Sequence, residues 1–136
     1  MEGYEFIKDK GHVTCKVRND GKTVSTCTLS ISVNERKWEV SYWNTCDGYK
    51  HLGYGKSSMG RVLEKAMEIY GMPEHIHYIW NGANEYVLEW MEKYFDAKCS
   101  CPIAVQKTQA GDDRESHIYI LDKQKVFEYF SIKTEQ

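Results

Sequence analysis

The sequence predicts a single α/β (α+β) domain with a mixed, mostly antiparallel sheet and helices on its faces. Three observations predict this fold class. The chain has 136 residues, which is near the commonest size of one domain. Its first third alternates apolar and polar residues, as half-buried strands do. At its centre, a strand pattern, a glycine-rich loop, a helical pattern and another strand pattern follow one another. We therefore expect residues 1–136 to form one domain.

The first third of the chain is typical of an antiparallel meander. Turn signals at Asn19-Asp20-Gly21 and Asn34-Glu35-Arg36 separate the strand patterns. Only Lys10-Gly11 and a few flanking residues separate the first two strands, so no helix fits between them. The expected strands are residues 4–8, 13–17, 27–33 and 38–43. In the last strand, alternation places Trp38, Val40 and Tyr42 on one face and Glu39, Ser41 and Trp43 on the other.

The remaining two thirds combine helices and strands. A helical period begins at Lys56 and ends at Tyr70, because Gly71 and Pro73 stop it. Since strands flank this helix, we expect the two central strands to be parallel, with a right-handed crossover. The later elements are a strand at 76–80, a helix from about 84 to 95, strands at 102–107 and 116–121, a polar loop at 109–115 and a short helix at 125–130.

Composition excludes several classes of protein. The formal net charge of −2 provides no global basic field for nucleic acid or an anionic membrane, so we expect neither partner. No apolar run reaches the roughly 18–20 residues that span a bilayer, and the N-terminus lacks a signal-peptide pattern. We therefore expect a cytoplasmic protein. Its five cysteines are an odd number, which favours free thiols over a disulfide framework. His75 and His77 could share a metal, but surface histidines are the simpler interpretation, and we expect no metal.

The segment from Asp47 to Ser58 is the most informative about function. It carries three glycines and leads directly into the amphipathic helix. A helix N-terminus exposes backbone N–H groups and a partial positive charge, and glycines let a ligand approach that backbone closely. Lys50 and Lys56 add positive charge. The segment therefore predicts a phosphate-binding site, although a glycine-rich turn that merely starts a helix is an alternative.

Two familiar phosphate-binding motifs fit this segment poorly. An ATP or GTP P-loop would need its first glycine at position 50, which is Lys50. A dinucleotide fingerprint beginning at Gly53 and Gly55 would need a third glycine where Ser58 stands. The chain also lacks the run of alternating strands and helices that builds a Rossmann sheet.

A third motif fits better. Lys50-His51-Leu52-Gly53-Tyr54-Gly55 resembles motif A of the GNAT superfamily, the Gcn5-related N-acetyltransferases, with Lys50 in place of the usual Gln or Arg. Asn84-Glu85, followed by Glu92-Lys93-Tyr94-Phe95, resembles part of the family's motif B. Glu39, on the strand before motif A, matches the general-base glutamate of the histone acetyltransferase branch. The resemblance covers about residues 24–121.

The resemblance implies a GNAT-like acyl-CoA N-acyltransferase fold whose two central parallel strands are splayed apart. Coenzyme A would lie in that gap as acetyl-CoA, a co-substrate, with its diphosphate on the amides of residues 51–56. The acyl carbonyl would face a backbone N–H near Thr45, and an amine would attack it directly after Glu39 removes a proton. The implied cofactor-binding residues are Trp43, Thr45, Lys50, His51, Leu52, Gly53, Tyr54, Gly55, Lys56, Ser57 and Asn84.

Two departures from the family pattern limit this expectation. Met91 stands where the family commonly has a tyrosine that protonates the leaving thiolate, and neither Tyr86 nor Tyr94 occupies that position. The helices that usually follow the first strand have no room, so we expect an open acceptor cleft that suits a bulky or macromolecular amine, or loss of activity. The alternative function is a coenzyme A or acyl-CoA binding module without turnover. An interaction protein that uses the aromatic residues is a third option. The resemblance also implies that a homodimer is an option, because exposed final strands often pair between subunits in this family.

Overall fold

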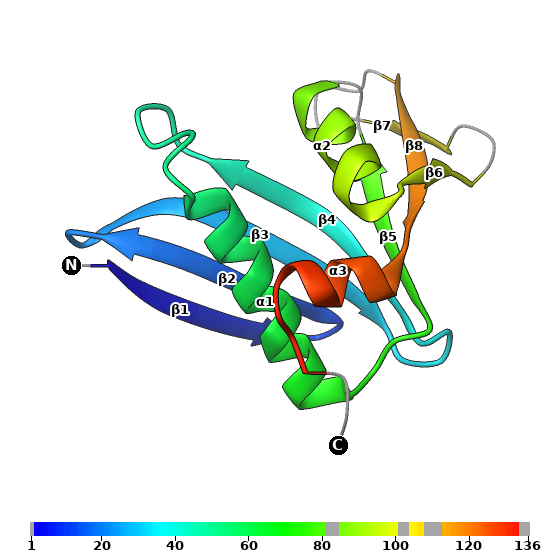
Figure 1. Ribbon diagram of the computed structural model, residues 1–136, viewed down its shortest axis with the longest axis horizontal. Coiled ribbons are helices and arrows are strands. Elements are labelled where there is room, and N and C mark those ends of the chain that lie inside the picture. Colours follow the sequence, from blue (N-terminus) through cyan, green and yellow to red (C-terminus); the bar gives the residue numbers. More distant parts are fainter. Residues whose placement is uncertain (1, 81–84, 101–103, 108–112, 134–136) are drawn as a thin grey trace. The chain divides into compact units, whose positions relative to one another are not determined.

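The computed structural model describes residues 2–80, 85–100, 104–107 and 113–133, which form two compact units, Met1–Glu74 and His75–Gln136 (Figure 1). The first unit holds β1 (Glu2–Asp9), β2 (His12–Asn19), β3 (Lys22–Ser32), β4 (Lys37–Thr45) and α1 (Tyr54–Tyr70). The second holds β5 (His75–Trp80), α2 (Glu85–Phe95), β6 (Lys98–Cys99), β7 (Ala104–Lys107), β8 (Asp113–Leu121) and α3 (Lys123–Tyr129).

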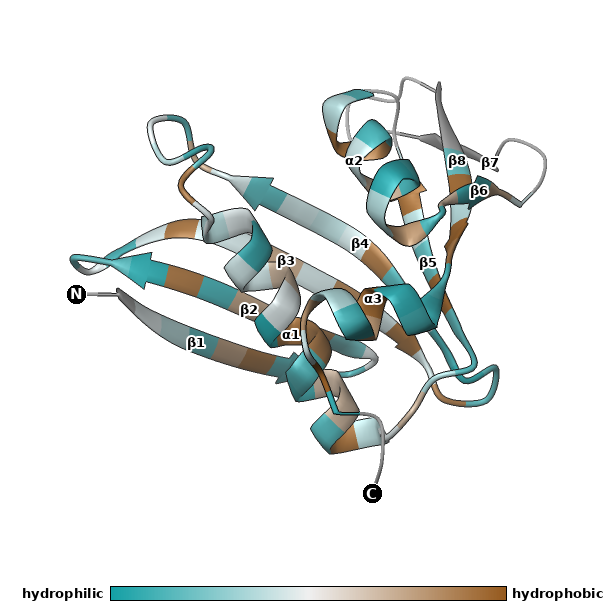
Figure 2. Cartoon of the chain, viewed as in Figure 1, coloured by the Kyte–Doolittle hydropathy of each residue, from teal (hydrophilic) through white to brown (hydrophobic). Residues whose placement is uncertain are grey.

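The first unit is an antiparallel meander covered on one face by α1 (Figure 1). Apolar residues on β2 and β3 alternate with polar ones, and the apolar set lies under the helix (Figure 2). From α1, residues three or four apart fill the other side of this core. The fully buried side chains of the unit include Val13, Cys15, Val17, Val24, Cys27, Leu29, Met59, Val62, Leu63 and Ala66.

Two β-bulges shift the alternation of strands in this unit. On β3, Val17 of β2 pairs with Ser25 while Arg18 pairs with Thr23, so Val24 and Ser25 are both buried. On β4, Thr28 of β3 pairs with Tyr42 while Leu29 pairs with Val40, which leaves Ser41 as the extra residue. Ser41 Oγ donates to the Thr28 carbonyl at 3.3 Å and so partners the backbone at the bulge.

The bulge on β4 corrects one expectation about faces. Strict alternation placed Trp43 with Glu39 and opposite Tyr42. In the structure the inserted residue reverses the phase after Ser41, so Tyr42 is 52% exposed and the Trp43 indole lies on the α1 side. A bulge leaves no signal in the apolar–polar pattern, which is why the sequence did not reveal it.

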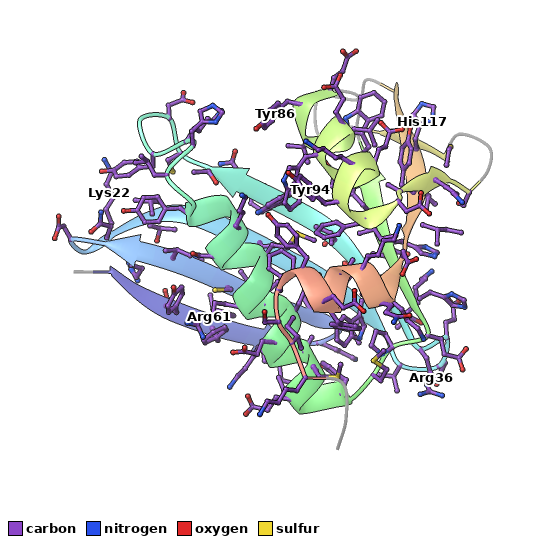
Figure 3. The ribbon with its side chains drawn as sticks, in the orientation of Figure 1. Lys22, Arg36, Arg61, Tyr86, Tyr94 and His117 are labelled. Atoms are coloured by element: carbon purple, nitrogen blue, oxygen red, sulfur yellow. The ribbon has the colours of Figure 1, made fainter. Side chains whose placement is uncertain are left out.

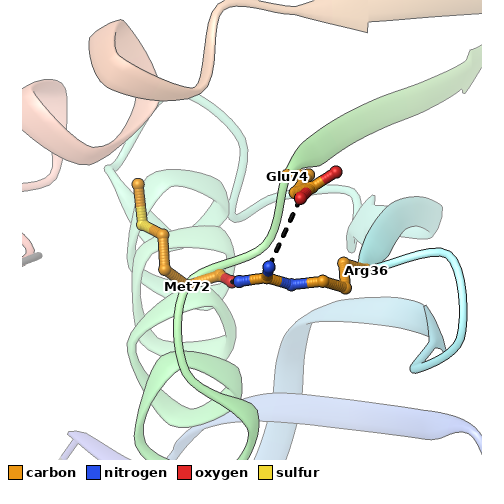
Figure 4. Close-up of polar contacts among 3 residues, drawn as sticks. All are labelled: Arg36, Met72 and Glu74. Atoms are coloured by element: carbon orange, nitrogen blue, oxygen red, sulfur yellow. Dashed lines mark hydrogen bonds and ion pairs between the residues drawn. The ribbon is translucent and has the colours of Figure 1, made fainter.

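The turn between β3 and β4 holds the chain that leaves α1 (Figure 4). Arg36 adopts a left-handed backbone (φ 52°), and its guanidinium donates to the Met72 carbonyl and pairs with Glu74, both at 3.3 Å. The Glu74 N–H donates to the Arg36 carbonyl at 2.7 Å. These contacts fix the end of the first unit to its own hairpin turn.

The second unit is also antiparallel wherever its strands pair. β8 pairs with β5, with the short β6 and with β7. Helices α2 and α3 contact one another through aromatic rings, among which the Trp90, Phe95 and Tyr129 centroids lie 5.0–5.5 Å apart. Asp122 caps α3 by accepting from the Lys125 N–H at 3.2 Å.

The expected fold class, a mixed α+β fold with mostly antiparallel pairing, is confirmed. No helix separates β1 from β2, as the sequence predicted. Residues 113–115 are wrong as a loop, because they pair with β7 despite their polar composition. Residues 102–103 and 109–112 lie outside the described part of the chain. The splayed parallel pair concerns how the two units meet and stays a prediction, as does the single domain.

Candidate coenzyme A site

The N-terminus of α1 is the centre of the candidate site. Gly53 precedes the helix in the left-handed conformation (φ 89°, ψ −1°), and no side chain caps the helix there. The first intrahelical bond runs from the Ser57 N–H to the Gly53 carbonyl at 3.0 Å. Amides that precede this bond point out of the helix end, where the helix dipole favours an anion. The sequence predicted a phosphate-binding site at this helix end, and that stays a prediction.

Gly55 has a packing reason to be glycine. A Cβ at this position would lie 3.2 Å from Thr45 Oγ1 and 3.6 Å from Trp43 Cζ2. The first turn of α1 therefore lies directly against the end of β4. Two sequence-predicted site residues, Trp43 and Thr45, are brought to this turn by their position on β4.

Hydrogen bonds join the same first turn to β3 and β4. Trp43 Nε1 donates to the Gly55 carbonyl at 2.9 Å, and Ser58 Oγ donates to the same carbonyl at 3.0 Å. Behind them, Ser25 Oγ lies 2.9 Å from Ser58 Oγ and 3.0 Å from Thr45 Oγ1. Ser25 and Ser58 are buried polar residues that sequence reasoning missed. The only available signal for Ser58 was a polar residue within the apolar stripe of the helix.

The loop before α1 is held by aromatic contacts at the β2–β3 turn. The Tyr49 and Tyr54 rings meet edge to face, with centroids 6.1 Å apart, and Asn19 Nδ2 donates to the Tyr54 hydroxyl at 3.0 Å. Lys22, which Figure 3 labels beside this loop, places its ammonium 6.0 Å from the Tyr49 ring. These contacts place Tyr54 as a structural anchor of the helix start.

The loop keeps its basic and apolar side chains at the surface. Lys50 and Lys56 are exposed, and Lys50 makes a 3.4 Å ion pair with Asp47. Leu52 is 65% exposed. His51 has a left-handed backbone (φ 64°), as have Gly48 and Gly53. The structure thus brings together every predicted loop residue from Lys50 to Ser57 at one helix end.

Glu39 lies on β4, four residues before Trp43 and on the opposite face. Its carboxylate accepts from the Lys37 ammonium at 2.9 Å, and Lys37 also pairs with Glu35 at 2.9 Å. The hydrogen bond to Glu35, which is the larger cause, and the hydrogen bond to Glu39 both raise the pKa of Lys37. The Glu39 side chain is 22% exposed. Glu39 therefore has a defined partner and stands on the polar face of the sheet.

The second unit provides less for the predicted site. Asn84 lies outside the described residues. Met91 is fully buried in α2, while Tyr86 is 63% exposed and Tyr94 contacts the rings of Trp90 and Tyr129 (Figure 3). Met91 has no ionisable group, so the structure assigns no acid there.

Metal and thiol chemistry find little support in the described part of the chain. The His75 and His77 rings lie 6.1 Å apart, but no group of three potential metal ligands occurs among the described residues. Cys15 and Cys27 are buried opposite one another on β2 and β3. Burial raises the pKa of Cys15 to about 11 and raises that of Cys27 well above its usual value. Neither thiol is poised to be a nucleophile at neutral pH.

A shallow hollow of about 330 Å³ lies at the β1–β2 turn, away from the helix N-terminus, and is lined by Lys8, Asp9, Lys10, Gly11 and Tyr70. None of the described helices is long and apolar enough to cross a membrane.

No protein-family model and no curated protein match this sequence. Solved structures do match. The ribosomal-protein-S18-alanine N-acetyltransferase from Escherichia coli has a TM-score of 0.62 at 13% identity, over 84% of this chain and 70% of its own. NAA60 from Arabidopsis thaliana, solved with a bisubstrate analogue, has a TM-score of 0.63 at 11% identity, over 83% and 77%. A GNAT-family protein from Desulfovibrio desulfuricans has a TM-score of 0.59 at 14% identity, over 82% and 69%. The chain therefore has the fold of the GNAT acetyltransferases.

Proposed function

We propose that this protein is an acyl-CoA-dependent N-acyltransferase that transfers acetyl from acetyl-CoA to an amine by direct attack. One observation carries the proposal. The glycine-capped start of α1, without a side-chain cap, lies against the end of β4. An anion-binding helix end beside a strand suits a ligand that joins a diphosphate to a long, amide-containing arm. Solved structures of the same fold include acetyltransferases, which supports the same chemistry.

In this proposal, the parts of the ligand lie in order along β4. The diphosphate would bind the amides of residues 51–56, with Lys50 and Lys56 adding positive charge. Because Thr45 lies beside Gly55, the diphosphate end of the ligand would be nearest Thr45. The arm between diphosphate and sulfur is long, so the thioester would lie farther back along β4, toward the bulge at Ser41. A backbone N–H in that part of β4 would then stabilise the developing oxyanion, in place of one near Thr45.

Glu39 is the proposed general base. An ammonium at neutral pH has no lone pair, so its proton must leave before the amine attacks the thioester. Moving the thioester back along β4 brings it closer to Glu39 than a position beside Thr45 would. The Lys37 ammonium holds the carboxylate in one orientation. Glu39 would accept the proton directly or through a water.

A specific observation also favours a second candidate, a coenzyme A or acyl-CoA binding module of the same fold. Met91 fills the core where an acid for the leaving thiolate is expected from the resemblance. Binding requires only the helix end and β4, whereas turnover also requires Glu39 and an amine. A small molecule or a protein could supply that amine, and the proposed chemistry needs no metal.

Release of coenzyme A from acetyl-CoA, measured with a thiol reagent against a panel of amines, tests the enzyme proposal. We expect Glu39→Gln to lower the rate by about 10²–10⁴-fold, the usual contribution of a general base, without changing the affinity for coenzyme A. Glu35→Gln is the matched control, because Glu35 pairs with the same Lys37 but lies in the exposed turn. It should leave the rate unchanged.

The outcomes separate the two candidates. No release by the wild type with any amine, together with tight binding of coenzyme A, would favour the binding module. Equal rates for the wild type and Glu39→Gln would reject the base assignment. A wild type that binds no coenzyme A would remove both candidates.

A further inference from the structure

We propose that Ser25, Trp43, Thr45 and Ser58 are positioning residues that hold the Gly55 peptide group against β4 and thereby set the affinity for coenzyme A. We call these four side chains the Gly55 clamp. The inference rests on the proposed function, because it assigns a role to residues behind the proposed diphosphate site. None of the four needs its side chain to touch the ligand.

The Gly55 carbonyl receives two side-chain donors. Trp43 Nε1 approaches from β4 at 2.9 Å, and Ser58 Oγ approaches from the next turn of α1 at 3.0 Å. An ordinary carbonyl in the first turn of a helix needs only its intrahelical amide partner. The Trp43 bond joins this turn directly to β4, while Ser58, on the same helix as Gly55, joins the turn to β3 through Ser25. Both donors also polarise the peptide group, whose N–H belongs to Lys56.

Behind the carbonyl lies a chain of buried hydroxyl groups. Ser58 donates its single hydrogen to the Gly55 carbonyl, so it can only accept from Ser25, 2.9 Å away. Ser25 in turn can accept from Thr45, 3.0 Å away. In the order Thr45, Ser25, Ser58, Gly55 each hydroxyl hydrogen is used once. The Ser25 hydrogen then goes to Ser58 at 2.9 Å, the nearer of its two acceptors, and not to the Asn44 carbonyl at 3.2 Å. The chain connects β3, β4 and α1.

These hydroxyls stand where apolar side chains would suffice for packing. Ser58 is 0% exposed and Ser25 is 1% exposed, and their neighbours Met59, Val24 and Val62 are apolar. Burying a hydroxyl is unfavourable unless it is hydrogen-bonded, and apolar contacts alone do not fix one orientation. The hydrogen bonds of Ser25 and Ser58 therefore indicate that the position of the first turn of α1 is important for binding. A pre-positioned set of amides binds an anion without first being ordered.

Calorimetric titration with coenzyme A tests the clamp. Thr45→Val and Ser58→Ala each remove one hydroxyl, and Trp43→Phe removes the indole N–H. Each should weaken binding by about 3- to 10-fold, which corresponds to the loss of one hydrogen bond. Thr45→Ser keeps the hydroxyl and should restore wild-type affinity.

The matched control is Thr14→Val. It removes a cross-strand hydroxyl pair of the same kind, Thr14 with Thr28 at 2.9 Å, on the face opposite α1. Its affinity for coenzyme A should equal that of the wild type even if its melting temperature falls as far as that of Thr45→Val. This comparison separates positioning from a general loss of stability. Ser58→Ala gives a second variant in a helix that favours alanine, should Thr45→Val fail to fold.

The failures are distinguishable. If the wild type binds coenzyme A and the Ser58→Ala, Thr45→Val and Trp43→Phe proteins bind it equally well, the clamp is wrong and the proposed function stands. If Thr14→Val loses as much affinity as Thr45→Val, the clamp is also wrong. If the wild type does not bind coenzyme A, the proposed function and the clamp both fall.

Discussion

Gly53 is the single residue on which the start of α1 most depends. Its φ of 89° lies in the left-handed region, and nothing lies within 4 Å of the position of an added Cβ. Conformation, and not space, therefore requires glycine here. The left-handed conformation is unfavourable by roughly 1–2 kcal/mol for an L-residue with a side chain, and it is less unfavourable for asparagine than for alanine.

We expect Gly53→Ala to lower the free energy of unfolding by about 1 kcal/mol and Gly53→Asn to lower it less. Coenzyme A affinity should fall in the same order, because the amides after position 53 would turn away. Denaturant unfolding and calorimetric titration measure the two effects. Gly11→Ala is the control, since Gly11 has a φ of 75° in the β1–β2 turn. Loss of affinity in this control would show that strain alone, wherever it lies, weakens binding.

At the residue scale, the sequence was informative where a single physical requirement explains why a residue type stands at its position. Gly53 and Gly55 were singled out by their resemblance to motif A, and the structure gives each a separate physical role. Ser25 and Ser58 could not be found, because a serine within an apolar pattern is compatible with either face of an element. Trp43 was placed on β4 correctly but on the wrong face, because the bulge at Ser41 is set by pairing with β3.

At the element scale, the facing thiols of β2 and β3 make stability depend on pH. Cys15 and Cys27 are opposite one another in the register and are both 0% exposed. Burial raises the pKa of Cys15 from 9.0 to about 11, and burial raises that of Cys27 well above 9.0 with a smaller contribution from Cys15. The unfolded chain loses these protons near pH 9, while the folded chain keeps them.

The contribution of these two thiols to the free energy of unfolding should therefore be constant below about pH 9 and should fall as the pH rises from 9 to 11. We expect the double variant Cys15→Ala, Cys27→Ala to be less stable than the wild type at pH 8. Between pH 8 and pH 11 it should lose less stability than the wild type does. Urea unfolding at a series of pH values measures this slope. Cys99→Ala, which removes an exposed thiol, should keep the wild-type slope. An unchanged slope in the double variant would contradict the prediction.

Elements with a strong periodic pattern were predicted well. Strands that form because a neighbouring strand pairs with them were not. The stripe of α1 and the turn at Asp20-Gly21 are local signals, and both elements formed where expected. Helix α1 begins two residues earlier than predicted, because Gly53 caps it before the apolar stripe starts. The two-residue β6 and the first residues of β8 carry no strand pattern and exist because of their partners.

At the scale of the whole chain, no helix lies between β1 and β2 to cover the face of the first unit opposite α1. Thr14 and Thr28 bond across this face, as do Ser30 and Ser41. Arg18 pairs with Glu5 on the same side. Ile7 and Tyr42 pair with Thr14 and Thr28 on this face and are 39% and 52% exposed, so the face mixes bonded polar side chains with exposed apolar ones. Length and turn signals were enough to predict this shortening.

The thermal stability of the intact protein tests the site as a whole. Ligand at about 100 times its Kd adds roughly 2.7 kcal/mol to the free energy of unfolding, because it binds only the folded state. We expect coenzyme A to raise the melting temperature. ATP with magnesium should raise it much less, because Lys50 replaces the first glycine of a P-loop.

Both ligands present a diphosphate and an adenosine, so the comparison shows what the pantetheine arm and the 3′-phosphate of coenzyme A add together. In the proposed complex the arm's amides would pair with the strand only when the helix end holds the diphosphate beside Thr45. Gly53→Ala should therefore reduce the effects of both nucleotides, and it should reduce that of coenzyme A more. Equal stabilisation of the wild type by the two nucleotides would mean that only the helix end binds. The strand would then have no part in recognition.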